Sequence, residues 1–191
     1  MNEILLIGNG PSARLSEAGA AIDSFDGPVL RFNTFRLNGH TTFVGSRCDM
    51  WATTDNFPAW QGLFEYERVF FMSFNTDPKN PKFLSFKEQM PKAEMLPRWA
   101  WMGCADVMGY TGTSSGAVVA FYMALFCQKV WLYGFDFFQT QQHHYGDNVA
   151  PGNLHKGEHE SAFFRKLYAL GRVGFFEDYH LQTEWGAKLC Q

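Results

Sequence analysis

Short runs of apolar, β-type residues alternate with helical patterns along the chain. The runs that predict strands are 3–7, 28–32, 48–52, 68–73, 129–133 and 173–176. The patterns that predict helices are 12–24, 57–66, 81–90, 114–126 and 158–170. Continuous apolar strands that alternate with helices form parallel sheets covered on both faces. The sequence therefore predicts a Rossmann-like α/β fold with a mainly parallel sheet, whose ligands bind beyond the carboxyl ends of the strands.

Length and composition indicate one folded domain over residues 1–191. Apolar residues make up 46% of the chain and charged residues 18%, which is enough material for a core. The formal charge is −3 and basic residues form no run, so nucleic acid is not an expected partner. The first residues carry no basic leader, and the longest apolar run, 117–127, is about half of what a bilayer span requires. We therefore expect a cytoplasmic protein without a transmembrane segment.

A turn with the sequence Gly8-Asn9-Gly10-Pro11-Ser12 follows the first predicted strand. Its glycines allow close approach of the backbone, its proline fits an early helical position, and its serine can cap a helix. Such a turn presents amide groups to an anion such as phosphate. The Gly-x-Gly-x-x-Gly fingerprint of dinucleotide sites is incomplete, because Ala13 stands where the third glycine would lie. A tight structural turn and a nucleotide site both fit these residues.

A second helix start, 111–116, has the sequence Thr-Gly-Thr-Ser-Ser-Gly and precedes the longest apolar run. Hydroxyl groups in the first turn of a helix can cap its unpaired amides. The same hydroxyls and amides can instead hold a carboxylate at the positive end of the helix dipole. From the residues alone, capping is the simpler interpretation.

Four of the six histidines lie between His143 and His159, in a stretch with little core character. Histidines that gather in a loop after a strand are typical of catalysis or metal binding. The spacing His155-x-x-x-His159 lacks the glutamate of a zincin helix, and no cysteine lies near it. We therefore expect catalytic histidines and no metal site.

In this order, these segments resemble the motifs of the animal-type sialyltransferase family. Residues 4–12, 31–33 and 44–47 are similar to parts of its large motif, and residues 113–116 to its small motif. Residues 144–147 resemble its third motif, with Gly146 in place of an aromatic residue, and residues 155–160 have the His-x-x-x-x-Glu spacing of its very small motif. The resemblance implies a variant GT-A glycosyltransferase fold. It also implies transfer of sialic acid from CMP-sialic acid to a hydroxyl group of a glycan or glycolipid acceptor.

The resemblance further implies which residues contact the CMP-sugar donor. They are Gly8, Asn9, Gly10, Ser12, Asn33, Ser114, Ser115 and Gly116. Uncharged amide side chains suit this task, because they bind phosphate and ribose without burying a charge. The alternative for Asn33 is that it only turns or caps the chain after its strand.

Four residues of the last two motifs are expected to act in the reaction. An inverting transfer needs a base for the acceptor hydroxyl, and the imidazole of His155 is our candidate. His144 and Tyr145 are suited to donate to the departing CMP phosphate, where negative charge develops. Glu160 is expected to anchor the last motif, and His159 to lie on a solvated helix face.

No Asp-x-Asp sequence, the usual metal anchor of enzymes that use nucleoside diphosphate sugars, occurs in the chain. A monophosphate leaving group carries less charge to neutralise, so we expect metal-independent transfer without a cofactor, the CMP-sugar being a substrate. Three alternatives stay open. They are a transferase for another CMP-linked acidic sugar such as Kdo, a noncatalytic nucleotide-binding module and a metal-dependent hydrolase.

The four cysteines, at positions 48, 104, 127 and 190, show no Cys-x-x-Cys spacing and are expected to be free thiols. Animal sialyltransferases bridge a cysteine of the large motif to one of the small motif. This chain has Cys127 as a counterpart of the second but Ile4 in place of the first, which agrees with a reducing cytoplasm. Residues 54–110 match no motif. Trp60, Trp99 and Trp101 in this segment either stack on a sugar or fill the core.

Overall fold

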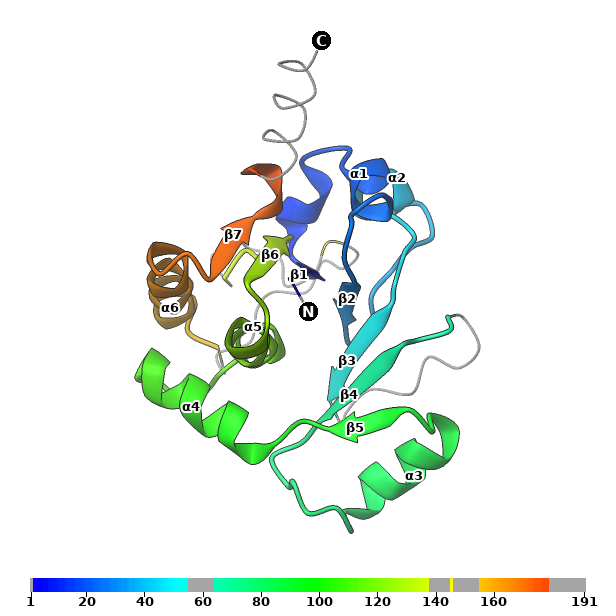
Figure 1. The fold of residues 1–191 in the computed structure, drawn as a ribbon, viewed down its shortest axis with the longest axis vertical. Coiled ribbons are helices and arrows are strands. Elements are labelled where there is room, and N and C mark those ends of the chain that lie inside the picture. Colours follow the sequence, from blue (N-terminus) through cyan, green and yellow to red (C-terminus); the bar gives the residue numbers. More distant parts are fainter. Residues whose placement is uncertain (1, 55–63, 138–144, 146–154, 179–191) are drawn as a thin grey trace.

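The computed structural model describes residues 2–54, 64–137, 145 and 155–178 (Figure 1). Its strands are β1 (Glu3–Ile7), β2 (Val29–Phe32), β3 (Met50–Thr54), β4 (Arg68–Met72), β5 (Ala93–Met95), β6 (Lys129–Tyr133) and β7 (Val173–Phe175). Its α-helices are α1 (Gly19–Asp23), α2 (Thr41–Val44), α3 (Pro81–Gln89), α4 (Arg98–Met108), α5 (Ser115–Phe126) and α6 (Gly157–Ala169). A short 3-10 helix, η1 (Pro11–Arg14), follows β1.

The strands form one parallel sheet with the order β5-β4-β3-β2-β1-β6-β7. From β1 to β5 the chain adds each new strand on the same side. It then crosses back through α4 and α5, so that β6 pairs with the other side of β1. The direction of winding therefore reverses between β1 and β6, and ligands of open α/β sheets bind at such a reversal, outside the carboxyl ends of the strands. The prediction of a Rossmann-like α/β fold is confirmed, and the described sheet is wholly parallel.

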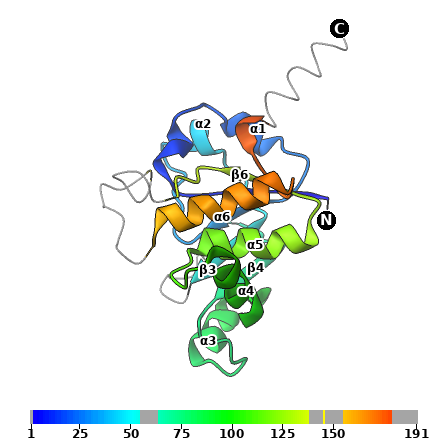
Figure 2. The same ribbon diagram turned by 90° about the vertical axis from the view of Figure 1, so that its left-hand side faces the viewer.

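Helices α4, α5 and α6 cover one face of the sheet (Figures 1 and 2). They bury alternate residues of the central strands, such as Ile4 and Leu6 of β1 and Leu132 of β6. Residues 117–120 of α5 are fully buried because they are small or β-branched and fit closely against the sheet. This layer fixes the start of α5 near the carboxyl ends of β1 and β6.

The opposite face carries η1, α1, α2 and α3 in two separate clusters. Leu5 and Ile7 pack with the first three helices, and Trp51 and Phe71 pack with α3. Successive strand residues point to opposite faces, so strands that are apolar throughout supply both layers.

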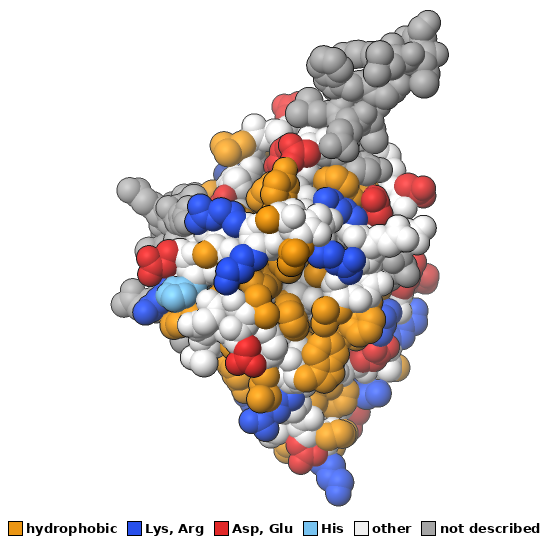
Figure 3. All heavy atoms as spheres, turned by 60° about the vertical axis from the view of Figure 1, so that its left-hand side comes forward, with side chains coloured by type: hydrophobic (Ala, Val, Ile, Leu, Met, Phe, Trp, Pro, Cys, Tyr) orange, Lys and Arg blue, Asp and Glu red, His pale blue; other side chains and the backbone are white. Residues whose placement is uncertain are grey.

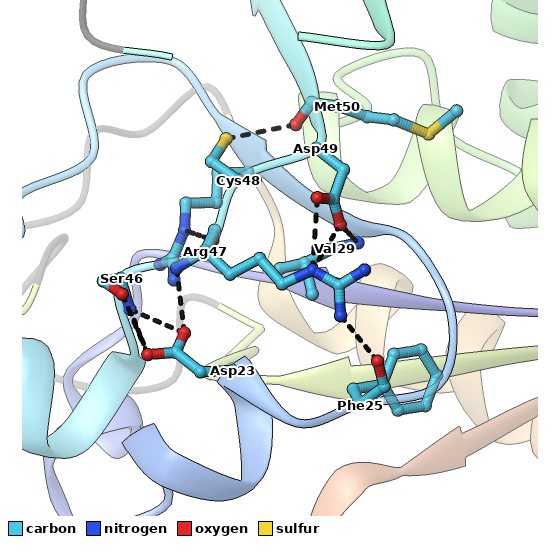
Figure 4. Close-up of polar contacts among 9 residues, drawn as sticks. Asp23, Phe25, Val29, Ser46, Arg47, Cys48, Asp49 and Met50 are labelled. Atoms are coloured by element: carbon cyan, nitrogen blue, oxygen red, sulfur yellow. Dashed lines mark hydrogen bonds and ion pairs between the residues drawn. The ribbon is translucent and has the colours of Figure 1, made fainter. Parts of the chain in front are cut away.

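A polar network ties the segment before β3 to α1 and β2 (Figure 4). The Asp23 carboxylate accepts hydrogen bonds from the amides of Ser46 and Arg47, at 2.7 and 2.8 Å. The Asp49 carboxylate accepts from the Val29 amide at 2.8 Å and pairs with the Arg47 guanidinium at 2.9 Å. Fully buried Arg31 donates to the carbonyls of residues 44 and 47, and burial lowers its pKa. The residues similar to the end of the large motif therefore stabilise the fold around the beginnings of β2 and β3.

Most predicted elements are confirmed with small shifts of their ends. The sequence prediction missed the three-residue edge strand β5, the single-turn helix α2 and the helix α4. Helix α4 does carry end signals, because Pro97 precedes it and Gly109 follows it with a φ of 68°. For the predicted helix 57–66, residues 57–63 lie outside the described residues, and 64–66 are not helical.

The predicted helix 12–24 is wrong, because it divides into η1 and α1. The hydroxyl of Tyr133, from β6, lies 2.9 Å from the Ala13 carbonyl and 3.1 Å from the Ser16 carbonyl. These carbonyls would otherwise accept bonds within a continuous helix. A contact with a distant strand therefore interrupts the continuous helix that local propensity favours here.

Candidate active site

Most of the predicted site residues that the structure describes lie at the reversal between β1 and β6. The turn after β1 meets the turn after β6, and the start of α5 lies beside both. The ring of Phe135, which follows β6, lies between the two predicted helix starts. A Cβ added to Gly8 would lie 3.0 Å from this ring, and one added to Gly116 would lie 2.8 Å from it. Phe135 was not predicted as a site residue, although sequence analysis places it directly after a strand.

The glycines of the first turn allow contact with another segment of the chain. The Gly8 amide donates to the Tyr133 carbonyl at 2.7 Å, and the Gly10 amide donates to the Gly134 carbonyl at 2.9 Å. A Cβ at Gly8 would lie only 2.4 Å from the Gly134 carbonyl oxygen, and Gly134 itself has a φ of 70°. Gly8, Gly10 and Gly134 therefore let two turns approach through bare backbone.

The predicted anion seat at Ser12 holds a carboxylate of the protein. The Ser12 amide donates to Oδ2 of Asp136 at 3.0 Å. Asp136 therefore occupies the start of η1, where the sequence predicted a phosphate. A phosphate at the same amide would meet the negative charge of Asp136. Asp136 was not predicted as a site residue.

Asn9 and Asn33 lie at the ends of β1 and β2. The Asn9 side chain donates to the Phe32 carbonyl at 3.1 Å, while its Oδ1 is buried without a hydrogen-bond partner among the described residues. Asn33 has a φ of 47°, and its Oδ1 accepts from the Thr54 amide at 3.1 Å. Asn33 thus performs the turning function, while its NH2 group is the part of the side chain that can donate to a ligand.

Tyr145 is buried and structural in its hydrogen bonding. Its hydroxyl donates to the Arg36 carbonyl at 2.6 Å, and its amide donates to the Asn9 carbonyl at 2.7 Å. Burial raises the pKa of this phenol. The hydroxyl that was predicted to donate to a leaving phosphate thus donates to the backbone of the chain in this structure. His144 lies outside the described residues.

Ser114 caps α5 and also binds the last motif. Its Oγ accepts from the Ala117 amide at 3.1 Å, as expected of an N-cap. The same hydroxyl donates to the carboxyl group of Glu160 in α6. Ser115 and Gly116 form the first turn beyond this cap, and both are half-buried.

Glu160 is buried, with 5% of its surface exposed. Burial raises the pKa of its carboxyl group to about 7, although the hydrogen bonds from Ser114 favour the ionised form. The contact joins two segments that are 46 positions apart in the chain. Glu160 therefore anchors the last motif to the start of α5, as the sequence analysis expected.

His155 contacts the segment that leads into α5. Its Nδ1 is 3.1 Å from the Gly112 carbonyl oxygen, two residues before Ser114. A carbonyl only accepts hydrogen bonds, so Nδ1 carries the proton and a neutral His155 has its lone pair on Nε2. The first and last residues of the His-x-x-x-x-Glu motif therefore both bind the 112–114 segment, and this fixes which nitrogen of His155 can act as a base.

His159 packs on the outer side of α6. Its ring stacks on Tyr110 at 5.1 Å, and its Nε2 is 4.0 Å from the carboxylate of exposed Glu158. Within the described residues, no three histidine, cysteine, aspartate or glutamate side chains gather as metal ligands would. Trp101 is buried and packs with Phe74 at 4.8 Å, whereas Trp99 is 46% exposed, and Trp60 lies outside the described residues.

Comparison with known proteins yields a family model and solved structures. Residues 98–172 match the model of glycosyltransferase family 29 (sialyltransferase). A crystal structure of a mammalian sialyltransferase in complex with Gal-beta-1-3GalNAc-ortho-nitrophenol is similar with a TM-score of 0.69 at 20% sequence identity, over 91% of this chain and 68% of that chain. A second crystal structure of a mammalian sialyltransferase gives a TM-score of 0.68, with the same identity and coverage. Curated proteins gave no match.

The matched residues 98–172 contain the start of α5, His155 and Glu160, whereas Asn9 and Asn33 precede them. The solved structures share the fold across both parts. The family model and the geometry thus concern the same hydrogen-bonded segments. Over residues 98–172 the chain is therefore similar to glycosyltransferase family 29 (sialyltransferase), and its fold is similar to that of the mammalian sialyltransferases.

Proposed function

We propose that this protein transfers sialic acid from CMP-sialic acid to a hydroxyl group of a glycan or glycolipid acceptor, with inversion and without a metal ion. The observation that carries the proposal is the arrangement of the 155–160 motif. Glu160 binds Ser114 and His155 binds Gly112, so one segment orients both the proposed base and the helix start, within the residues that match the family 29 model.

In the proposed reaction, Nε2 of His155 takes the proton of the acceptor hydroxyl as its oxygen bonds to the anomeric carbon. The bond from that carbon to the CMP phosphate breaks, and its electron pair leaves with CMP. Attack from the face opposite the leaving group inverts the anomeric centre.

The departing phosphate needs donors that do not already have partners. Ser12 and Tyr145 are engaged with Asp136 and Arg36, so we assign them to the support of the site. We assign His144 and the first-turn amides of α5 at Ser115 and Gly116 to the donor, together with Asn9 and the NH2 group of Asn33.

We also infer a reducing, cytoplasmic setting and a variant GT-A fold. The support for the setting is that Cys48, Cys104 and Cys127 are free and buried. Burial raises the pKa of the first two thiols to about 12, which makes them unreactive.

CMP is expected to raise the melting temperature of the protein without any divalent ion, because a ligand that binds only the native state stabilises it. Thermal-shift titrations with CMP, CDP, UDP, ADP and NAD in the presence of a chelator measure this effect. Equal or larger shifts with UDP plus manganese, or with NAD, would contradict the CMP assignment.

Asn33→Asp is expected to weaken CMP binding about tenfold or more with little loss of stability. Aspartate retains an oxygen for the Thr54 amide and tolerates a positive φ, but it has no NH2 group and adds a negative charge. Calorimetric titration with CMP and a melting curve measure the two effects. Unchanged CMP affinity in a folded Asn33→Asp protein would leave Asn33 with the turning function alone.

His155→Ala is expected to reduce transfer from CMP-sialic acid by roughly a hundred- to ten-thousand-fold, because a general base is removed. CMP affinity should change little. His159→Ala, on the outer side of α6, is the matched control and should retain activity. Normal transfer by His155→Ala would eliminate the proposed base.

His144→Ala provides a contrast, because the proposed function places this side chain on the leaving phosphate. It should weaken CMP binding and slow transfer together, and a donor with a better leaving group should recover part of the rate.

Glu160→Gln is expected to change how stability depends on pH. The folded-state pKa of Glu160, about 7, lies above its ordinary value of 4.5, so the unfolded chain binds fewer protons between these values. The free energy of unfolding of the wild type should therefore fall by about 3 kcal/mol relative to Glu160→Gln as the pH rises through this window. Urea unfolding at pH 4.5 and pH 8 measures the difference. Glu158→Gln, on the exposed side of α6, should show no such change.

A further inference from the structure

Large apolar side chains gather on the outer surface of α4, α5 and α6 (Figure 3). Trp99 is 46% exposed on α4, Phe126 is 60% exposed at the end of α5, and Leu170 is 72% exposed just after α6. Exposed residues of the same surface are Trp99, Met102, Leu125, Phe126, Tyr168 and Leu170. We call these six residues the apolar face. Contiguous apolar patches of this kind mark sites of interaction with proteins or membranes.

The centre of the apolar face is an aromatic group built from two helices. Tyr122 of α5 packs on Trp99 at 5.5 Å and on Phe126 at 5.0 Å. These contacts hold exposed tryptophan and phenylalanine rings in place on a rigid helix pair. Tryptophan and tyrosine are favoured at the boundary of lipid and water, because an apolar ring and a polar edge suit both sides of it.

Basic side chains surround the apolar face. Exposed Arg98 begins α4 beside Trp99, and exposed Lys166 reaches from α6 to the Val107 carbonyl at 3.3 Å. The Arg172 guanidinium donates to carbonyls at the end of α5, and Lys129 donates to the Gly171 carbonyl at 3.3 Å, next to Leu170. Figure 3 shows Lys and Arg side chains on several sides of the orange surface.

The three helices carry three acidic residues, of which exposed Asp106 lies on the same side of α4 as Trp99 and Met102. They are Asp106 near the end of α4, and Glu158 and Glu160 in the first turn of α6. The protein as a whole carries a formal charge of −3, so the basic surroundings of the apolar face are not a consequence of a basic composition. The four basic side chains around the apolar face outnumber the one acidic side chain of these helices beside it, Asp106, and this excess favours an anionic partner.

We propose that the apolar face and its basic rim dock this protein on the surface of an anionic lipid bilayer. Aromatic and aliphatic side chains enter the headgroup region, and the basic side chains contact lipid phosphates, each contributing about 1 kcal/mol. The proposed contact is peripheral, and no helix within the described residues is long and apolar enough to cross a membrane.

Helix α5 sets the position of the active site relative to the bilayer. It begins directly after its cap Ser114, which binds Glu160, and ends in the apolar face at Phe126. Its twelve residues span about 18 Å. The docked orientation therefore directs the site away from the lipid, toward the outer part of a glycan. Docking itself does not depend on which sugar is transferred.

Flotation of the full chain with phosphatidylcholine vesicles, with and without phosphatidylglycerol, tests the proposal. Binding is expected to be about tenfold or more stronger to vesicles that contain phosphatidylglycerol, and to weaken as salt is added. The double variant Trp99→Ser/Phe126→Ser and the double variant Arg98→Glu/Lys166→Glu should each reduce binding about tenfold or more. Leu84→Ser is the matched control, because Leu84 is 48% exposed on α3, on the other face of the sheet, and should bind as the wild type does.

Leu125→Glu is a further variant for the case in which loss of the aromatic group disturbs folding, since Leu125 is 54% exposed and takes no part in that group. Melting temperatures show that each variant is folded. Equal binding to neutral and anionic vesicles, or binding unchanged in all these variants, overturns the proposal. Light scattering tests a second copy of the chain as the occupant. A wild-type dimer that Leu125→Glu dissociates and that does not bind vesicles also overturns it.

Discussion

Contact between bare backbone segments at the centre of the sheet determines how this site is built. The turns after β1 and β6 approach so closely that a methyl group on Gly8 would overlap the Gly134 carbonyl. This approach brings Phe135 and Asp136 against the first turn, and Phe135 in turn packs on Gly116 at the start of α5. Without side chains at these glycines, the two halves of the sheet meet at a distance that allows the predicted donor residues to share one site.

The protein uses the same solution at two helix starts. The Asp136 carboxylate accepts a hydrogen bond from the Ser12 amide at the start of η1. The Glu160 carboxyl group accepts one from the Ser114 hydroxyl at the start of α5. Each carboxyl group comes from a segment more than forty positions away and compensates the partial positive charge of a helix start. At α5 the arrangement also places His155, because the same short helix-leading segment binds both ends of its motif. One set of hydrogen bonds thus anchors α6 and orients the ring of His155, the base that we propose.

The sequence predicted the strands and the parallel α/β class well, because apolar runs such as Glu3–Ile7 and Lys129–Tyr133 are long and continuous. It named Ser114 and Glu160 as candidate site residues but did not predict that they bind each other, since no local pattern records a contact between distant segments. The unbroken helix 12–24 was wrong because the Tyr133 hydroxyl acts from 120 positions away. Tyr145 was named as a candidate catalytic residue from its motif. Its hydroxyl donates to the Arg36 carbonyl, and a contact over 109 positions cannot be read from sequence spacing.

The order of the strands has a consequence for how the chain folds. β1 lies between β2 and β6. A side-chain hydrogen bond also joins these strands, because the Trp131 indole donates to the Glu3 carboxylate, 128 positions earlier in the chain. Pairings over such separations carry a large loop-closure entropy and slow folding. During synthesis, one side of β1 therefore waits unpaired until β6 has been made, and its exposed edge is a place where another chain can add. Rapid completion of the α4 and α5 crossover limits the time for which the nascent protein is open to misassembly.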